Sequence, residues 1–130
     1  MSLVLDASVV VAYLTASDRA FPLGTMFERG EDLHVPTYCD VEVVSGLSRW
    51  ERHRGMRGEV PELLLDYVSL PLARHDHLRL LGRMLELRRK FSAVDASYLA
   101  LAESLGAAFV TLDSTLARAA REHTQLPVFP

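Results

Sequence analysis

Short, strongly apolar segments alternate along this chain with longer segments of helical character, and this alternation restricts the fold more than any other feature. Residues 3–5 and 108–112 are apolar with little interruption, which is typical of strands covered on both faces. Further short strands are predicted at 33–35, 70–73 and 127–129. Strands separated by helices predict an α/β fold in which helices cover a parallel sheet.

The helical segments have recognisable ends. Gly30 and Gly106 follow two of them at the position where a left-handed residue often ends a helix. Asp76 and Ser92 are residue types that cap the start of a helix. Helices are predicted at residues 8–14, 22–29, 37–53, 61–68, 76–90, 93–105 and 114–122.

Composition excludes several classes of protein. The 130 residues are of the length of one domain, so we expect residues 1–130 to fold as a single unit. The net charge of −3 excludes a strongly cationic nucleic-acid coat. The longest uncharged run, Ala7–Ser17, is too short to cross a membrane. With Cys39 as the only cysteine, no disulfide can form within the chain, and we expect a cytoplasmic protein.

Acidic residues follow or flank the predicted strands. Asp6 and Asp113 come directly after the two most apolar strands, and Asp95 opens the helix before the second of them. Glu42 lies early in the helix that follows residues 33–35, although Asp40 is as plausible by position alone. Ligands of open α/β sheets bind beyond the carboxyl ends of the strands. We therefore expect at least three acids to meet at one edge of the sheet.

Each acid also has a purely structural interpretation. Asp6 and Asp113 could cap the helices that follow them, and Ser92 with Asp95 matches a capping box. Glu42 could be a solvated helix residue. Several carboxylates at one edge would repel one another unless a cation neutralised them. Mg²⁺ or Mn²⁺ prefers such oxygen ligands, and a site of this kind suits phosphodiester hydrolysis.

Three segments carry a resemblance to a known family. The chain resembles the PIN-domain ribonucleases, and in particular the VapC-type toxins of bacterial toxin–antitoxin pairs. The resemblance covers nearly the whole chain, and its most specific parts are residues 4–8, 40–47 and 91–113. It implies a three-layer α/β/α fold with four or five parallel strands. It also implies an endoribonuclease that uses Mg²⁺ or Mn²⁺ and acts as the toxin of a type II toxin–antitoxin pair.

The same resemblance implies a set of site residues and partners. It favours Glu42 over Asp40, and it makes Ser8 and Ser92 supporting hydroxyl residues. The implied partners are RNA, a cognate antitoxin and a second copy of the chain in a homodimer. The implied catalytic acids are Asp6, Glu42, Asp95 and Asp113, of which Asp6, Asp95 and Asp113 would be the metal ligands.

Basic residues cluster at the end of the helix that carries Glu42. They could hold RNA phosphates beside the acids, or they could form a solvated face near a helix C-terminus. Trp50 lies among them, and we expect it to be a packing or interface residue rather than a base-stacking platform. The candidate RNA-binding residues are Arg49, Arg52, Arg54 and Arg57.

Three other functions are compatible with parts of the pattern. A PIN-fold nuclease could process RNA without being a toxin, and an inactive PIN-like module could bind without cleaving. A phosphoaspartate receiver domain would also place an acid after a buried strand. A receiver needs an acidic pair there and a lysine after a late strand, whereas Asp6 has no acidic neighbour and the only lysine, Lys90, ends a helix.

Overall fold

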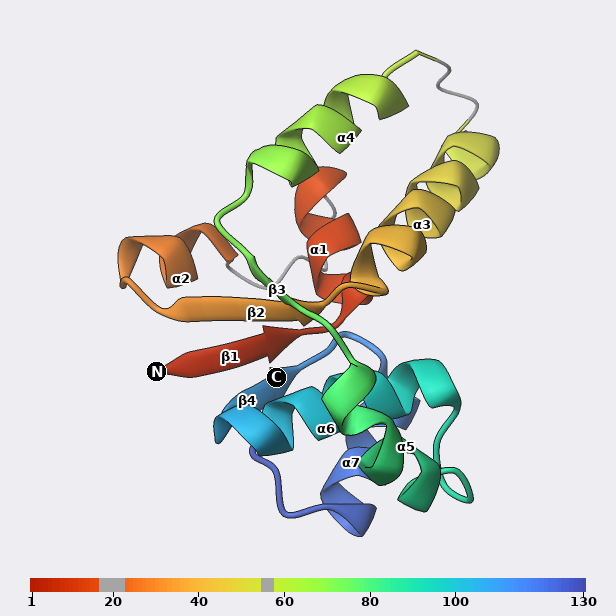
Figure 1. The fold of residues 1–130 in the computed structure, drawn as a ribbon. Helices are drawn as coiled ribbons and strands as arrows, with labels where there is room; N and C mark the ends of the chain where they lie inside the picture. Colours follow the sequence, from red (N-terminus) through yellow and green to blue (C-terminus); the bar gives the residue numbers. More distant parts are fainter. Residues whose placement is uncertain (17–22, 55–57) are drawn as a thin grey trace.

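A parallel sheet of five strands forms the centre of the protein, in the order β3-β2-β1-β4-β5 (Figure 1). The computed structural model describes residues 1–16, 23–54 and 58–130. β1 is the middle strand, and its Leu3 aligns with Leu33 on one side and Ala108 on the other. The strands are β1 Ser2–Leu5, β2 Asp32–Pro36, β3 Ala73–His75, β4 Ala108–Val110 and β5 Val128–Phe129.

Helices cover both faces of this sheet. In Figure 1, α1, α3 and α4 lie together on one face, and α5, α6 and α7 lie on the other. The arrangement confirms the predicted three-layer α/β/α fold. The helices are α1 Ala7–Leu14, α2 Leu23–Glu28, α3 Cys39–Arg54, α4 Val60–Ser69, the 3₁₀ helix η1 Leu78–Leu80, α5 Leu81–Glu86, α6 Ala93–Leu105 and α7 Ser114–His123. Among the described residues, no helix is both long and apolar enough to cross a membrane.

The packing of α1 against α3 is unusually close, and it aligns the two helices that border the site. Gly46 of α3 faces Val11 of α1, where a Cβ atom on Gly46 would lie only 2.7 Å from a Val11 methyl carbon. A larger residue at Gly46 would therefore push the helices apart. Because α1 follows β1 and α3 follows β2, both helices begin at the carboxyl edge of the sheet.

The segment before α6 differs from the sequence prediction. A strand was expected at residues 70–73, but β3 extends over Ala73–His75. Leu72, just before it, is buried in the core, whereas the strand itself is largely exposed. A single helix was expected over residues 76–90, but η1 and the short α5 occupy its place. Residues 87–90 form a turn instead of continuing the helix, and Leu87 and Phe91 are both buried. Pro22, predicted to begin a helix, lies outside the described residues.

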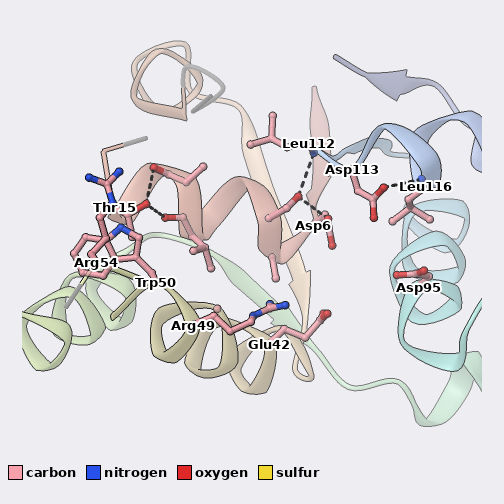
Figure 2. Close-up of a pocket in the computed structure, with 15 residues that line it drawn as sticks. Asp6, Thr15, Glu42, Arg49, Trp50, Arg54, Asp95, Leu112, Asp113 and Leu116 are labelled. Atoms are coloured by element: carbon pink, nitrogen blue, oxygen red, sulfur yellow. Dashed lines mark hydrogen bonds between the residues drawn. The ribbon is translucent and has the colours of Figure 1, made fainter. Parts of the chain in front are cut away.

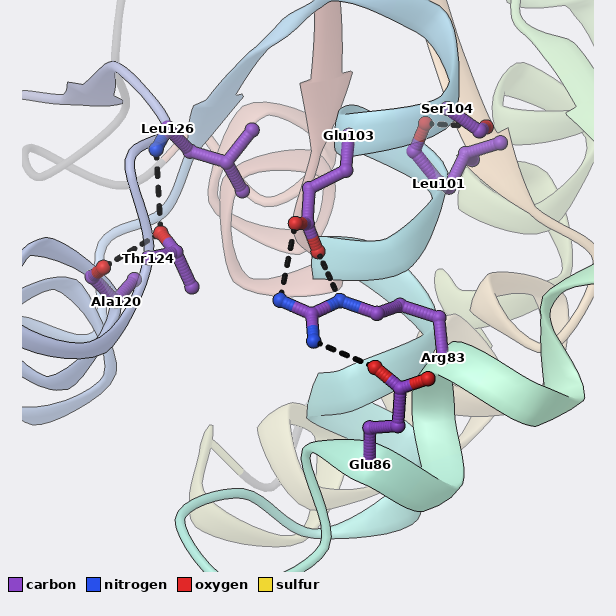
Figure 3. Close-up of polar contacts among 8 residues, drawn as sticks. All are labelled: Arg83, Glu86, Leu101, Glu103, Ser104, Ala120, Thr124 and Leu126. Carbon is purple, nitrogen blue, oxygen red and sulfur yellow. Dashed lines mark hydrogen bonds and ion pairs between the residues drawn. The ribbon is translucent and has the colours of Figure 1, made fainter.

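Arg83 fixes the short helix α5 to the long helix α6 (Figure 3). Its guanidinium donates two parallel hydrogen bonds, each 3.1 Å, to the two carboxylate oxygens of Glu103 on α6. A third bond of 3.0 Å reaches Glu86 within α5. The paired geometry matches the planar guanidinium to a carboxylate and orients α5 along α6.

Candidate functional site

The predicted acids from four separate segments line one cavity at the carboxyl edge of the sheet (Figure 2). Its volume is about 500 Å³. Asp6 follows β1, Glu42 lies on α3, Asp95 lies in the first turn of α6, and Asp113 precedes α7. Residues as far apart in the sequence as Asp6 and Asp113 thus meet, because parallel strands end at the same edge of the sheet.

Asp6 is held by hydroxyl groups and does not cap the helix that follows it. Its Oδ2 accepts hydrogen bonds from Ser8 Oγ at 2.6 Å and from Thr111 Oγ1 at 2.8 Å. Both hydroxyls also accept a backbone N–H, Ser8 from Leu112 and Thr111 from Asp113. The carboxylate makes no capping bond to α1 and is 7% exposed. The helix-cap interpretation of Asp6 was therefore wrong.

Asp113 and Asp95 combine a structural role with a place in the cavity. Asp113 Oδ1 accepts the backbone N–H groups of Thr115 and Leu116, both at 3.0 Å, and so caps α7. Ser92 caps α6 by accepting the N–H of Asp95 at 3.1 Å. These bonds confirm that Asp113 and Ser92 cap the two helices. The capping bonds also orient the Asp113 carboxylate, and both Asp95 and Asp113 line the cavity.

Glu42 and Asp40 separate onto different sides of α3. Glu42 Oε1 accepts a hydrogen bond from the buried Tyr98 hydroxyl of α6, and Glu42 lines the cavity. Asp40 instead accepts bonds from the Tyr67 hydroxyl and, at 2.9 Å, from Arg74 Nε. Asp40 thus ties α3 to α4 and β3.

The acids of the cavity influence one another electrostatically. Burial raises the pKa of Glu42 above its ordinary value, and the charges of Asp6 and Asp95 add to the shift. Burial likewise raises the pKa of Asp95, with further contributions from Asp6 and Asp113. The charged form of each carboxylate is therefore stabilised if its neighbours lose their charge or if a cation enters the cavity.

The donor set fits a hard divalent cation. All four acids offer carboxylate oxygens, the ligands that Mg²⁺ and Mn²⁺ prefer. In the conformations seen for residues 1–16, 23–54 and 58–130, no three His, Cys, Asp or Glu side chains already enclose a metal position. An ion that keeps several of its waters needs only one or two direct carboxylate ligands, so an open acidic cavity suits it.

Basic residues border the acids on α3. Arg49 and Arg54 line the first cavity, and Arg49 and Arg52 line a neighbouring second cavity of about 690 Å³. All three arginines are exposed, and within the part of the chain that the structure describes none of them forms an ion pair. They are therefore available to an anionic ligand. Arg57, the fourth predicted residue, lies outside the described residues.

Sequence analysis did not identify Thr111 and Tyr98, although both left a signal. Thr111 is the only polar residue of the apolar segment 108–112 and precedes Asp113 by two positions. Tyr98 follows Asp95 by three positions, which places both on one face of a helix. Burial raises the pKa of the Tyr98 hydroxyl, so it remains a hydrogen-bond donor to Glu42.

Trp50 was expected to be a packing or interface residue. Its side chain is only partly exposed, lies outside the hydrophobic core and lines the first cavity. Two other residues also have clear environments. Cys39 is fully buried, and burial raises its pKa to about 11, so it is not a reactive thiolate. His75 contacts His34 of the neighbouring strand at 2.8 Å between ring nitrogens.

Comparison with known proteins agrees with this fold. The family model described as the PIN domain matches residues 3–122. Ribonuclease VapC9 of Mycobacterium tuberculosis is 36% identical over 129 residues, covering 98% of each chain. Ribonuclease VapC12 of the same species is 30% identical, covering 89% of this chain and 90% of its own. The chain therefore belongs to the PIN-domain family and, within it, to the VapC ribonucleases.

A solved structure supports the fold independently. The structure of VapBC2 from Rickettsia felis, bound to a DNA fragment from their promoter, superposes with a TM-score of 0.72. The match covers 98% of this chain and 97% of that one at 14% sequence identity. At so low an identity the similarity concerns the backbone arrangement, and it confirms the expected PIN-like architecture.

Proposed function

We propose that this protein is a divalent-metal-dependent endoribonuclease and the toxin of a type II toxin–antitoxin pair. The observation that carries the proposal is the meeting of Asp6, Glu42, Asp95 and Asp113 in one cavity of a VapC-family chain. The family membership removes the phosphoaspartate receiver as an alternative.

The three aspartates would hold the ion, directly or through water. Asp6 is fixed by Ser8 and Thr111, and the capping bonds of Asp113 orient its carboxylate. Mg²⁺ or Mn²⁺, when bound, lowers the pKa of a water ligand and stabilises charge on the phosphate oxygens. Ser8 and Ser92 support the site by positioning Asp6 and the first turn of α6.

Glu42 is assigned to the attacking water. It lies on α3, opposite the three aspartates that come from β1, α6 and the segment before α7. Tyr98 binds Oε1 and leaves Oε2 to accept a hydrogen bond from water. Glu42 would orient this water for in-line attack on phosphorus and accept its proton as the new P–O bond forms. The P–O bond to the leaving ribose oxygen breaks in the same displacement, and that oxygen takes a proton from solvent.

Arginines beside the acids are assigned to the RNA backbone. Arg49 and Arg54 line the cavity of the acids, and Arg52 lines the adjoining one. Guanidinium groups bind phosphate oxygens in a bidentate manner, which orients the strand without reading its sequence. Arg57 belongs to the same assignment by its sequence position.

The proposal extends to partners and location. The Rickettsia felis relative was solved as a VapBC2 complex, and we assign an antitoxin partner and a homodimer to this chain as well. Apolar side chains exposed on α4, namely Leu64, Leu65 and Val68, support coverage by a partner chain. We place the protein, a single PIN domain over residues 1–130, in the cytoplasm, where RNA is available.

Cleavage of total cellular RNA by the purified, partner-free protein tests this proposal. We expect discrete fragments in Mg²⁺ or Mn²⁺ and none with a chelator. Asp95→Asn should abolish cleavage, whereas the matched control Asp66→Asn, an exposed aspartate of α4 outside the cavity, should retain it. A folded wild-type protein that leaves every RNA intact in both metals would contradict the nuclease assignment.

The toxin role needs a separate test. Induction of the wild-type gene in cells should arrest growth, and co-expression of a cognate antitoxin should restore growth. Cleavage in vitro without growth arrest would favour a PIN-fold nuclease that processes RNA.

A further inference from the structure

The acidic centre lies where two cavities meet. Glu42, Arg49 and Asp95 line both of them. The first cavity continues from the acids along α1 and α3 toward Thr15, Trp50 and Arg54. In Figure 2, Trp50 and Arg54 lie at the end away from Asp95 and Asp113. A strand with its reacting phosphate at the acids would therefore extend along α3.

Trp50 offers an aromatic face with no evident structural use. Among the described residues, no aromatic ring or cation stacks on it, and it takes no part in the core. The wall beside it is built from small and apolar residues, including Ala12, Val11 and Gly46. An apolar, aromatic wall next to an arginine suits a nucleobase with its phosphate.

The distance from the acids sets the position of such a base. Glu42 and Trp50 are separated by eight residues of α3, which corresponds to about 12 Å along the helix axis. Stacked bases rise by about 3.4 Å each, so a base on Trp50 would lie about three or four nucleotides from the reacting phosphate.

The second cavity lies on the other side of the acidic centre. Its lining combines the polar Ser45, Ser48, Arg49 and Arg52 with Tyr38, Val44 and Val94. The hydroxyl and guanidinium groups can bind phosphates and sugars. A strand could therefore continue past the acids on this side through contacts with its backbone.

We propose that the Trp50 end of the first cavity is a stacking subsite for a nucleobase of single-stranded RNA, about three or four nucleotides from the cleaved bond. The inference rests on the proposed ribonuclease function, and it assigns the substrate class as an unpaired strand. A base in a duplex is already stacked on its neighbours and would not be available to Trp50.

Tryptophan fluorescence tests the subsite directly, because Trp50 is the only tryptophan in the chain. The wild-type protein is titrated with a short oligoadenylate in chelator, so that no cleavage occurs, and in parallel with inorganic polyphosphate. We expect saturable quenching by oligoadenylate and none by polyphosphate, which can bind the arginines but cannot stack.

Variants separate stacking from packing. Trp50→Leu keeps an apolar side chain without an aromatic face, and Trp50→Phe keeps the face. Measured with dye-labelled RNA, Trp50→Leu should bind roughly ten-fold more weakly, the effect expected for losing one base–aromatic stack. Trp50→Phe should stay close to wild type, and the thermal midpoints of both should be unchanged because Trp50 is outside the core.

The cleavage assay in Mn²⁺ is run on the same preparations. If the wild type cleaves RNA while Trp50 emission does not respond or Trp50→Leu binds equally well, the subsite is wrong and the nuclease assignment stands. If the wild type neither binds nor cleaves RNA, both fall together.

Discussion

Asp40 and Glu42 lie two positions apart on α3, and each accepts a hydrogen bond from a tyrosine of another helix. Asp40 also has a cation, Arg74, at 2.9 Å, and its contacts join α3 to α4 and β3. Glu42 has no such ion pair among the described residues and lies with other acids in a cavity. An acid bound by a tyrosine thus has two different roles on this helix. Asp40 stabilises the fold, whereas Glu42 remains accessible to a ligand in the cavity.

The largest expected effect separates these two acids by activity. Glu42→Gln removes the group that orients and deprotonates water, so we expect RNA cleavage to fall by at least about 10²-fold. Asp40→Asn should leave cleavage within a few-fold of wild type, while it lowers the free energy of unfolding by about 1 kcal/mol through the weakened contacts with Tyr67 and Arg74. Cleavage rates and urea unfolding of both variants measure this. Equal loss of cleavage in both would remove the distinction.

Tyrosine substitutions extend the comparison to the two donors. Tyr98→Phe leaves Glu42 without its positioning bond, and we expect kcat to fall roughly ten-fold with KM unchanged, as for other residues that orient a catalytic group. Tyr67→Phe should keep kcat and lose about 1–2 kcal/mol of stability, because the bond to Asp40 is charge-assisted. Steady-state kinetics on a labelled RNA and unfolding curves distinguish them. If Tyr98→Phe raised KM and left kcat unchanged, the positioning role would be contradicted.

In the metal-free protein, the crowded acids of the cavity should also lower the stability of the fold at neutral pH. Burial and the neighbouring Asp6 and Asp113 raise the pKa of Asp95 above its ordinary value of 3.8. The folded state therefore holds this proton more tightly than the unfolded chain, and the stability contributed by Asp95 falls as the pH rises through the raised pKa. At neutral pH, Asp95→Asn should melt a few degrees higher than wild type, and this advantage should vanish below the ordinary pKa.

Metal addition should reverse that order. Saturating Mg²⁺ or Mn²⁺ binds the folded wild type and raises its melting temperature, with little effect on Asp95→Asn. Asp40→Asn serves as the control and should keep the wild-type response to metal. Thermal melts with and without chelator measure both effects. A wild-type melting temperature indifferent to metal would contradict the cation site.

The smallest effect concerns the arginines. Arg52 is exposed beside the second cavity, whereas Arg74 is engaged by Asp40 and lies over the Tyr67 ring. Arg52→Gln should weaken RNA binding a few-fold and reduce the slope of log affinity against log salt by about 0.7, the value for one phosphate contact with a single strand. Arg74→Gln should leave the slope unchanged. Binding titrations over a range of salt concentrations distinguish the two.

Much of this arrangement could be predicted from the sequence, for identifiable reasons. Apolar segments ending in Asp6 and Asp113 indicated both the sheet and the edge at which acids gather. The choice between Asp40 and Glu42 could not be made from the residues, because positions two apart in a helix face different directions and nothing local says which direction the sheet edge occupies. That choice depended on family resemblance.

Other features could not be predicted because tertiary packing decides them. β3 consists of partly exposed residues with no apolar pattern, and its pairing with β2 alone makes it a strand. The helix expected over residues 76–90 is divided into η1, α5 and a turn at residues 87–90, and Arg83 binds α5 to Glu103 of α6. The position of Trp50 likewise depends on how α1 and α3 pack, which no local pattern of α3 reveals.

The most direct test of the central claim is to locate the metal. Crystals of the protein grown with Mn²⁺ and measured by anomalous diffraction would show where the ion binds. We predict an anomalous peak in the cavity, about 2.1 Å from a carboxylate oxygen of at least one of Asp6, Asp95 and Asp113, and no peak in crystals of Asp95→Asn. A peak elsewhere on the molecule, or none in the wild type at saturating Mn²⁺, would contradict the assignment of these acids to a metal-dependent nuclease.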